Sequence, residues 1–353
     1  MNTPQYTWGD LTTHLINGQD LEARATTWAM DQVMNGGATP VQLAGFLVAL
    51  RAKGETVAEM TGLAQAMMDH AVTYPDLAFS TNAVDIVGSG GDRMHTVNIS
   101  TMASLVIAGT GTAVVKHGNR ASSSSSGSAD VLEALGIPLN HVPERVAQIG
   151  AKVGITFCFA QTFHPSMRYA ATARKELNVP TAFNYLGPIT NPGQPRATAV
   201  GVADMRMAPL IAGVFAGRGT QALVFRGALG LDELAAIGPA DIWSVDRSTV
   251  THEVLDPVQD LGLSPIDVAD LRGASAEFNA QVARDFLAGK PGPVRETVLL
   301  NAAAALVASG TEPETQSGTL AERLRGGYAV AQRAVDDGRA LGILDAWRVE
   351  ASK

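Results

Sequence analysis

The sequence predicts an α/β protein in which a small helical N-terminal domain precedes a larger α/β domain with a central, mainly parallel sheet. Residues 1 to about 75 show helical apolar spacing without an intervening strand. From Val84 onward, short β-branched runs alternate with helical segments, which is typical of parallel α/β architecture. A length of 353 residues with 46% apolar residues can supply about two domains.

Composition narrows the classes of function. The net charge of −8 argues against a general nucleic-acid or membrane surface, so an anionic ligand would need backbone amides, a few well-placed cations or a metal ion. Cys158, the only cysteine, lies in an apolar run and is expected to be a buried strand residue rather than a nucleophile. The N-terminus lacks a leader pattern, and no stretch reaches the ~18 apolar residues of a membrane span. We therefore expect a soluble, cytoplasmic protein.

The N-terminal segment is expected to hold three or four helices. One helical face is formed by Leu21, Ala25, Trp28, Ala29 and Val33. Asn35-Gly36-Gly37 stops this helix, and two capping boxes follow, Thr39-Pro40-Val41-Gln42 and Thr56-Val57-Ala58-Glu59. Because the segment carries no obvious chemistry, its simplest interpretation is a packing or dimerisation unit.

Five buried strands are expected in the second domain, at 84–87, 113–116, 155–159, 198–202 and 221–226. Beyond Asp241 the pattern predicts two antiparallel strands, helices at 276–288 and 294–309, and a C-terminal helical pair, with no residues for chemistry. Ligands of parallel α/β folds gather at the carboxyl ends of the strands. The motifs of this chain lie at such ends.

The first motif, Gly88-Ser89-Gly90-Gly91-Asp92, breaks the strand at 84–87. Its glycines allow positive φ and bring bare N–H groups close to a ligand, and Asn98, Ser100 and Thr101 open the following helix. A tight structural turn is the alternative interpretation. The stretch matches neither the Walker loop nor the dinucleotide fingerprint, so a different phosphate-binding chemistry is predicted.

The second motif, Lys116-His117-Gly118-Asn119-Arg120, follows the strand at 113–116. A serine-rich loop, Ser122 to Ser126 with Gly127, leads from it into a helix at Ala129 to Leu135. Five serines alone suggest a flexible linker. Their flanking cations and helix start instead favour a cluster of donors for phosphate oxygens.

Two further segments carry charged side chains that are either solvated or functional. His164-Pro165 begins a helix that bears Arg168 and Arg174, and an arginine on such a helix is commonly solvated. Asp232-Glu233 follows the strand at 221–226, where the pair is either a solvated turn or a magnesium site.

Together these motifs resemble the anthranilate phosphoribosyltransferase family of tryptophan biosynthesis. The matching pieces are GSGGD at 88–92, NIST at 98–101, KHGNRASSSSSGSAD at 116–130, FHPSMRYAATAR at 163–174, FNYLGPITNP at 183–192 and LDE at 231–233. The segment ATPVQLAGFLVALRAKGET is similar to the family's N-terminal region. The resemblance implies transfer of phosphoribose from phosphoribosyl pyrophosphate (PRPP) to the amino group of anthranilate, with two Mg²⁺ ions and in a homodimer. It also implies a helical domain at 1–78, completed by helices near 164–185, and a PRPP-binding α/β domain at 79–353 of the type shared with nucleoside phosphorylases.

The resemblance implies site residues motif by motif. Those expected to hold PRPP are Gly88, Gly91, Asp92, Thr96, Asn98, Ile99, Ser100, Thr101, Lys116, His117, Gly118, Asn119, Arg120, Ala121, Ser122, Ser123, Ser124 and Ser128. Those expected to contact anthranilate are Gly88, Asn119, His164 and Arg174. Ser100, Asp232 and Glu233 are the expected metal ligands, and Lys116, Asp232 and Glu233 the expected catalytic residues.

The chemistry agrees with this assignment. Departure of pyrophosphate develops negative charge on the leaving oxygen, which Mg²⁺ and Lys116 would stabilise. The aromatic amine of anthranilate is neutral at pH 7, so no activating base is required. Arg174 would hold the carboxylate of anthranilate through its forked guanidinium.

The chain departs from the family pattern beside the acidic pair. The family usually has His-Gly, one variable residue, then Asp-Gly-Leu-Asp-Glu, whereas this chain has Arg226 and Leu229 in place of the histidine and the first aspartate. The lost negative charge predicts a raised Mg²⁺ requirement without loss of activity. Ser89 in place of the family's threonine is a milder change.

Two other functions are alternatives for these motifs. A pyrimidine nucleoside phosphorylase of the same fold has no pyrophosphate to manage, so the Asp232-Glu233 pair and Arg174 count against it. A non-catalytic nucleic-acid-binding relative would need a basic groove, which the net charge of −8 disfavours. The expected partners are therefore small-molecule substrates and a second copy of the chain, with neither nucleic acid nor membrane.

Overall fold

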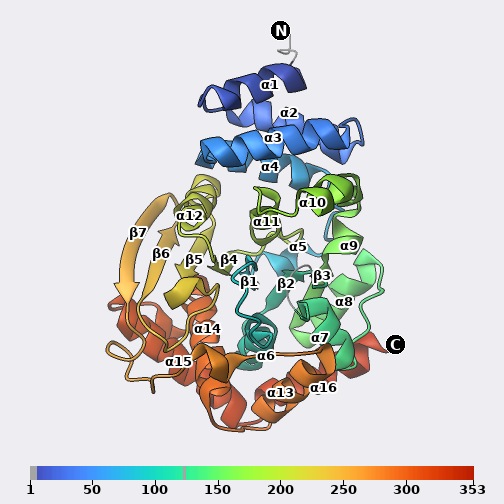
Figure 1. The fold of residues 1–353 in the computed structure, drawn as a ribbon. Coiled ribbons are helices and arrows are strands. Elements are labelled where there is room, and N and C mark those ends of the chain that lie inside the picture. The colour runs from blue at the N-terminus through green and yellow to red at the C-terminus, as the bar shows by residue number, and fades with distance from the viewer. Residues whose placement is uncertain (1–5, 122–124) are drawn as a thin grey trace.

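A computed structural model describes residues 6–121 and 125–353. Four helices form an N-terminal layer at the top of Figure 1: α1 Trp8–Ile16, α2 Ala23–Met34, α3 Pro40–Lys53 and α4 Val57–Asp69. Both predicted capping boxes are present, because the Thr39 and Thr56 hydroxyls each accept from the backbone three residues on. The predicted stop after α2 is confirmed, since Asn35 is its C-cap. We call α1–α4 the helical unit.

A seven-stranded sheet forms the centre of the molecule. Its strands are β1 Val84–Gly88, β2 Val114–Gly118, β3 Ile155–Phe159, β4 Ala197–Gly201, β5 Gln221–Arg226, β6 Ala240–Asp246 and β7 Thr249–Leu255, in the order β3-β2-β1-β4-β5-β6-β7. The first five are parallel, and β6 and β7 are antiparallel to their neighbours. The predicted fold class and each predicted strand are confirmed to within a residue or two.

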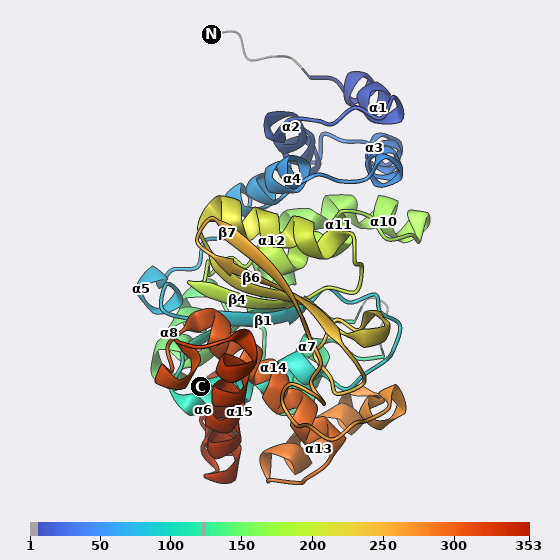
Figure 2. The ribbon, with the colours of Figure 1, turned by 90° about the vertical axis from the view of Figure 1, so that its left-hand side faces the viewer.

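Helices cover both faces of the sheet, as Figure 2 shows. Beyond the helical unit the helices are α5 Leu77–Ser80, α6 Ile99–Thr110, α7 Ser128–Ala134, α8 Pro143–Val153, α9 Ala160–Phe163, α10 Ala171–Leu177, α11 Phe183–Leu186, α12 Met207–Arg218, α13 Ala276–Leu287, α14 Pro293–Ser309, α15 Leu320–Asp336 and α16 Arg339–Ala351. Short 3₁₀ turns lie at Pro165–Ala170, Gly187–Ile189, Ala228–Gly230, Val268–Leu271 and Pro313–Thr315. No helix in the described ranges is long and apolar enough to cross a bilayer.

Alternate residues of the strands pack into different cores. Val84 and Ile86 of β1 pack with α6 and α14 on one face. On the other face, Val200 and Val224 join a core that runs through α12 into the helical unit. Cys158 is fully buried in β3, as predicted. The helical unit is thus continuous in packing with one face of the sheet.

The segment after His164 differs from its prediction. The expected helix begins as a 3₁₀ turn, Pro165–Ala170, and becomes α-helical only at α10. Tighter turns are frequent at the N-termini of helices, where proline occupies the first position. The core of the helical unit includes Ala170, Ala173 and Phe183, so this later segment packs with α1–α4.

Candidate functional site

The glycine loop after β1 has the backbone shape that its sequence predicts. Gly90 and Gly91 have φ of 68° and 87°, and Arg93 and His95 also have positive φ. The loop then leads to α6, which begins at Ile99. The glycine loop and the N-terminus of α6 line one cavity, which we call the first cavity. The cavity has a volume of about 300 Å³. Backbone amides in this arrangement favour an anionic ligand.

Three carboxylates meet beside this loop. Asp92, Asp232 and Glu233 each place one oxygen within 4.8 Å of the others. Asp232 Oδ2 accepts from the Gly90 amide at 2.6 Å, and Glu233 Oε1 accepts from Thr96 Oγ1 at 3.4 Å. Asp92 Oδ2 and Glu233 Oε2 are buried without a hydrogen-bond partner among the described residues. The solvated turn is therefore the wrong interpretation of the acidic pair.

Burial and mutual repulsion disfavour the ionised forms of Asp232 and Glu233. Burial and then the nearby charge of Asp92 raise the pKa of Asp232 to about 7. Burial and the charges of Asp232 and Asp92 raise the pKa of Glu233 well above its ordinary value. Mg²⁺ prefers carboxylates combined with substrate phosphate oxygens. The unpartnered oxygens therefore fit a divalent cation, with Asp92 as a ligand that sequence reasoning had given only to PRPP.

Glycines let the backbone close around Asp232. A Cβ atom on Gly88 would lie 2.3 Å from Asp232 Oδ2, and one on Gly201 would lie 1.6 Å from Asp232 O. Gly88 and Gly201 end the neighbouring strands β1 and β4. No other residue fits at either position without moving the acidic turn.

Lys116 lies beneath the cavity instead of lining it. Its side chain is 1% exposed, and Nζ donates to Ile86 O at 2.5 Å and to Ser100 Oγ at 3.1 Å. Burial lowers the pKa of Lys116 to about 8, against the attraction of Asp85. Direct contact of Lys116 with the leaving group, as the sequence suggested, is thus not the geometry observed. Its ammonium reaches the site only through Ser100.

Two histidines lie side by side near the end of β2. The rings of His117 and His164 are 5.2 Å apart. His117 Nδ1 contacts Gly187 O at 3.0 Å, and its buried Nε2 has no partner among the described residues. Burial and the neighbouring His164 lower the pKa of His117 to about 3. His117 is therefore neutral at pH 7.

A second cavity of about 680 Å³ adjoins the first. Arg174 of α10 and Asn184 of α11 line both cavities, as do Gly88 and Asn119, whereas His164 lines only the second. Arg174 has no ion pair or hydrogen bond with any described residue, and burial lowers its pKa. This guanidinium is placed to receive a carboxylate from a ligand.

Arg120 is already engaged by the protein. Its guanidinium contacts Asp130 at 3.0 Å and Glu133 at 2.6 Å, both on α7. Asp130 also accepts from the amides of Ala121 and Gly127. These contacts hold the two ends of the serine-rich loop. Ser122, Ser123 and Ser124 lie outside the described residues.

Most of the predicted site residues line the first cavity. Those that line the first cavity are Gly88, Gly91, Asp92, Thr96, Asn98, Ile99, Ser100, His117, Gly118, Asn119, Arg120, Ala121, Ser128, Asp232 and Glu233. Thr101 and Lys116 do not, because both are buried below it.

Two asparagines were missed by sequence reasoning. Asn301 of α14 lines the first cavity and exchanges hydrogen bonds with the backbone of Leu234, and Asn279 Nδ2 donates to Asn98 Oδ1 at 2.8 Å. The sequence prediction placed no site residue beyond Asp241, whereas Asn301 contributes to the wall of the first cavity. A lone asparagine in the apolar run of α14 was the available signal.

The family departures lie on the turn before Asp232. Arg226 Nε donates to Ala203 O at 3.0 Å, so this side chain braces the turn. Leu229 is 67% exposed and has φ of 61°. Its side chain does not point into the acidic group.

A glycine-lined anion cavity, a carboxylate cluster and an adjoining arginine-lined cavity define an enzyme that transfers a group from a phosphorylated donor to an anionic acceptor. Residues 80–341 match the profile "Glycosyl transferase family, a/b domain", and residues 9–71 match "Glycosyl transferase family, helical bundle domain". The chain is 56% identical over 341 residues to an anthranilate phosphoribosyltransferase of Arthrobacter sp., covering 97% of this chain and 95% of that one. It is 54% identical to that of Thermobifida fusca, covering 98% and 97%.

Solved structures agree with these relatives. The anthranilate phosphoribosyltransferase of Thermus thermophilus superposes with a TM-score of 0.88 at 37% identity, covering 98% of this chain and 100% of that one. The Saccharomyces cerevisiae enzyme in complex with PRPP and Mg gives 0.85 at 25% identity, with 98% of each chain covered. The chain belongs to the anthranilate phosphoribosyltransferase family.

Proposed function

We propose that the two adjoining cavities bind PRPP and anthranilate and that phosphoribose passes between them. The products are N-(5-phosphoribosyl)anthranilate and pyrophosphate. Family membership gives the activity, which belongs to tryptophan biosynthesis. The observation that carries the placement is the shared wall of the cavities, where Gly88 and Asn119 line both and the carboxylates face only the first.

The residues of this chain suit the donor cavity to pyrophosphate and ribose phosphate. Amides of the glycine loop and the N-terminus of α6 would bind phosphate oxygens. Asp92, Asp232 and Glu233 would hold Mg²⁺, which supplies neutralisation of the departing pyrophosphate when bound. Two ions is our proposal, and calorimetric titration of Mg²⁺ in the presence of PRPP gives the number directly.

The acceptor cavity would orient anthranilate by its carboxylate. Arg174 supplies the forked donor, and Asn119 lies at the junction toward the donor. His117, with a pKa lowered by burial to about 3, adds no positive charge beside a ribose that becomes positive during transfer. The amine of anthranilate attacks as the neutral form, so this chemistry requires no base at the junction.

Lys116 is assigned a supporting role. Its ammonium donates to Ser100 Oγ, and it would fix that hydroxyl for a contact with the donor or its metal. A buried ammonium below the phosphate site also contributes positive potential through a low-dielectric interior.

Mixing the purified protein with PRPP, Mg²⁺ and anthranilate tests this function. We expect anthranilate fluorescence to fall only when all three components are present, and Asp232→Asn with Glu233→Gln to abolish the change. Phosphorolysis of a pyrimidine nucleoside, or salt-sensitive DNA binding without turnover, would instead support one of the two alternatives.

A homodimer is proposed through the helical unit. Ile16 of α1 is 73% exposed, and Val41 and Val48 of α3 are 82% and 45% exposed. Both helices belong to the N-terminal layer at the top of Figure 1. Exposed apolar residues grouped on adjacent helices favour an interface. Val41→Glu with Val48→Glu should reduce the mass measured by light scattering to that of one chain. Location in the cytoplasm remains the expectation from the sequence.

A further inference from the structure

The loop between β4 and α12, Val202 to Arg206, contacts both the catalytic turns and the helical unit. We call it the 202–206 loop. It begins directly after Gly201, whose missing side chain makes room for Asp232. Its backbone faces the site, and its charged side chains face α3. A single short segment therefore lies between the carboxylates and a helix that contributes nothing to either cavity.

Ala203 makes the contacts on the side of the site. Its amide donates to Ser89 Oγ at 3.1 Å, and its carbonyl accepts from Arg226 Nε at 3.0 Å. Ser89 belongs to the glycine loop, and Arg226 begins the turn that ends at Asp232 and Glu233. One peptide residue thus positions both elements that would hold the donor and its metal.

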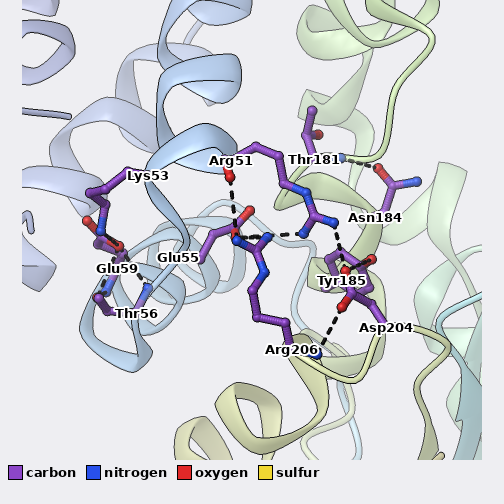
Figure 3. A network of polar contacts seen from close by, with 10 residues as sticks. All are labelled: Arg51, Lys53, Glu55, Thr56, Glu59, Thr181, Asn184, Tyr185, Asp204 and Arg206. Atoms are coloured by element: carbon purple, nitrogen blue, oxygen red, sulfur yellow. Dashed lines mark hydrogen bonds and ion pairs between the residues drawn. The ribbon is translucent and has the colours of Figure 1, made fainter. Parts of the chain in front are cut away.

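Asp204 and Arg206 make the contacts on the side of the helical unit, which Figure 3 shows. Arg51 Nη2 donates to Asp204 Oδ2 at 2.7 Å, and Arg206 Nη2 donates to Glu55 Oε2 at 2.7 Å. The Glu55 side chain is fully buried. Arg51 also lies 3.8 Å from Glu55, and loss of both arginines would leave a buried charge unpaired, so these contacts hold the loop against the end of α3.

Asp204 also reaches the acceptor side. Tyr185 donates from its hydroxyl to Asp204 Oδ2 at 3.4 Å. The neighbouring Asn184 lines both cavities, and its Oδ1 accepts from the Thr181 amide at 3.0 Å. One carboxylate therefore contacts α3 and the segment that carries the acceptor-side residues.

We propose that Asp204 and Arg226 are positioning residues, through which the placement of the helical unit sets the glycine loop and the acidic turn. This inference rests on the proposed binding of Mg²⁺ and PRPP by those two elements. The path is continuous: Arg51, Asp204, the backbone of Ala203, then Ser89 and Arg226. A chain of hydrogen bonds and ion pairs can carry coupling of this kind, and each contact on this path is 3.1 Å or shorter.

Loosening the 202–206 loop should lower the affinity for Mg²⁺ specifically. Phosphoryl and pyrophosphate ligands demand closely placed donors, and small displacements at a distance lower rates strongly. Loosening Ala203 would move the Gly90 amide and the Asp232 carboxylate, which form a hydrogen bond of 2.6 Å, relative to one another. A contact that served only to join two domains would change stability and leave Mg²⁺ affinity as it was.

Asp204→Asn tests the proposal with a matched control. Asp20→Asn removes another aspartate that pairs with the end of α3, through Lys53 at 2.6 Å, on the far side from the loop. We would titrate Mg²⁺ with PRPP present, following the rise in melting temperature and, separately, the rate. Asp204→Asn and Arg226→Gln should each raise the half-saturating Mg²⁺ concentration about fivefold, and Asp20→Asn should not. The half-saturating Mg²⁺ concentration of the double variant should be no higher than that of the more impaired single variant, because both substitutions act through Ala203.

Two results would overturn the proposal. One is a lowered melting temperature for Asp204→Asn with a half-saturating Mg²⁺ concentration within twofold of wild type. The other is a fully additive double variant. Failure of the underlying function has a different signature, since the unmodified protein would then show neither turnover nor a thermal response to Mg²⁺ with PRPP.

Discussion

Two glutamates of this molecule that carry buried carboxylate oxygens have opposite surroundings. Glu59 of the helical unit is fully buried, and it accepts from Lys53 Nζ at 2.9 Å, from the Thr56 amide at 2.8 Å and from the Leu21 amide at 2.9 Å. Glu233 of the acidic turn accepts only from Thr96, and its Oε2 has no partner among the described residues. One glutamate is satisfied by the fold alone, and the other is not.

The difference in hydrogen-bond partners distinguishes a carboxylate that serves the fold from one that is available to a ligand. A satisfied buried carboxylate contributes to stability, whereas an unsatisfied one costs free energy unless a ligand completes it. The raised pKa values of Asp232 and Glu233, caused first by burial, express that cost. The cluster therefore indicates where a cation is expected.

The largest expected effect comes from removing the acidic pair. Asp232→Asn with Glu233→Gln should lower turnover at least about a thousandfold, roughly 4 kcal/mol in barrier, because the metal ligands are lost. The melting temperature without Mg²⁺ should not fall. Turnover within about tenfold of wild type, roughly 1.4 kcal/mol, would rule out a metal-binding role.

Glu59→Gln should lower the stability of the protein and leave its turnover nearly unchanged. Lys53 is 4% exposed and keeps its pair with Asp20 at 2.6 Å, but it loses the charged Glu59 acceptor, so the free energy of unfolding should fall by about 2 kcal/mol. Urea denaturation compares this variant with Glu233→Gln. If both variants lost stability equally, the contrast between the two glutamates would be wrong.

Removing the arginine of the acceptor cavity should have a smaller effect. Arg174→Ala should raise the Michaelis constant for anthranilate about tenfold or more and leave that for PRPP nearly unchanged, because only the acceptor offers it a carboxylate. Lys175→Ala, an exposed cation on the same helix, is the control. Equal increases for both substrates would make Arg174 a structural residue.

Local signals in the sequence account for what could be predicted. The glycines at 88, 90 and 91, the capping boxes at Thr39 and Thr56, and the strands all depend on neighbours along the chain. The position of Lys116 beneath Ser100, the approach of Asp92 to Asp232, and the contribution of Asn301 depend on packing between distant segments. The buried and unpartnered Oε2 of Glu233 is also a product of packing that no local pattern encodes.

The pH dependence of the metal response sharpens the contrast further. Asp232 has a folded pKa raised to about 7 from the ordinary 3.8, so the stability it contributes in protonated form is complete below 3.8 and lost as pH rises through 7. Mg²⁺ needs the deprotonated form. The rise in melting temperature caused by Mg²⁺ should therefore be larger at pH 8 than at pH 6. Asp232→Asn should reduce this difference, because Glu233 is then the remaining carboxylate with a raised pKa, and an equal response at both pH values in the wild type would contradict the prediction.

The smallest expected effect concerns Leu229, where the family has an aspartate. The two departures from the family pattern differ in their contacts. Arg226 braces the turn through Ala203, whereas the side chain of Leu229 is exposed and has no structural explanation. Its φ of 61° is unfavourable for leucine and well tolerated by aspartate and asparagine. Leu229→Asn and Leu229→Asp should both raise the free energy of unfolding by about 1 kcal/mol through relief of strain.

Only the aspartate adds negative charge near the acidic group, so only Leu229→Asp should lower the half-saturating Mg²⁺ concentration. The gain should be modest, about 1 kcal/mol or less, because the side chain at 229 is solvated and lies outside the carboxylate cluster. Asparagine has the same shape and the same backbone preference, and it therefore isolates the charge. Equal Mg²⁺ requirements in the two variants would show that the family's aspartate at this position serves the turn alone, and that the three carboxylates of this chain already supply all the negative charge that the metal needs.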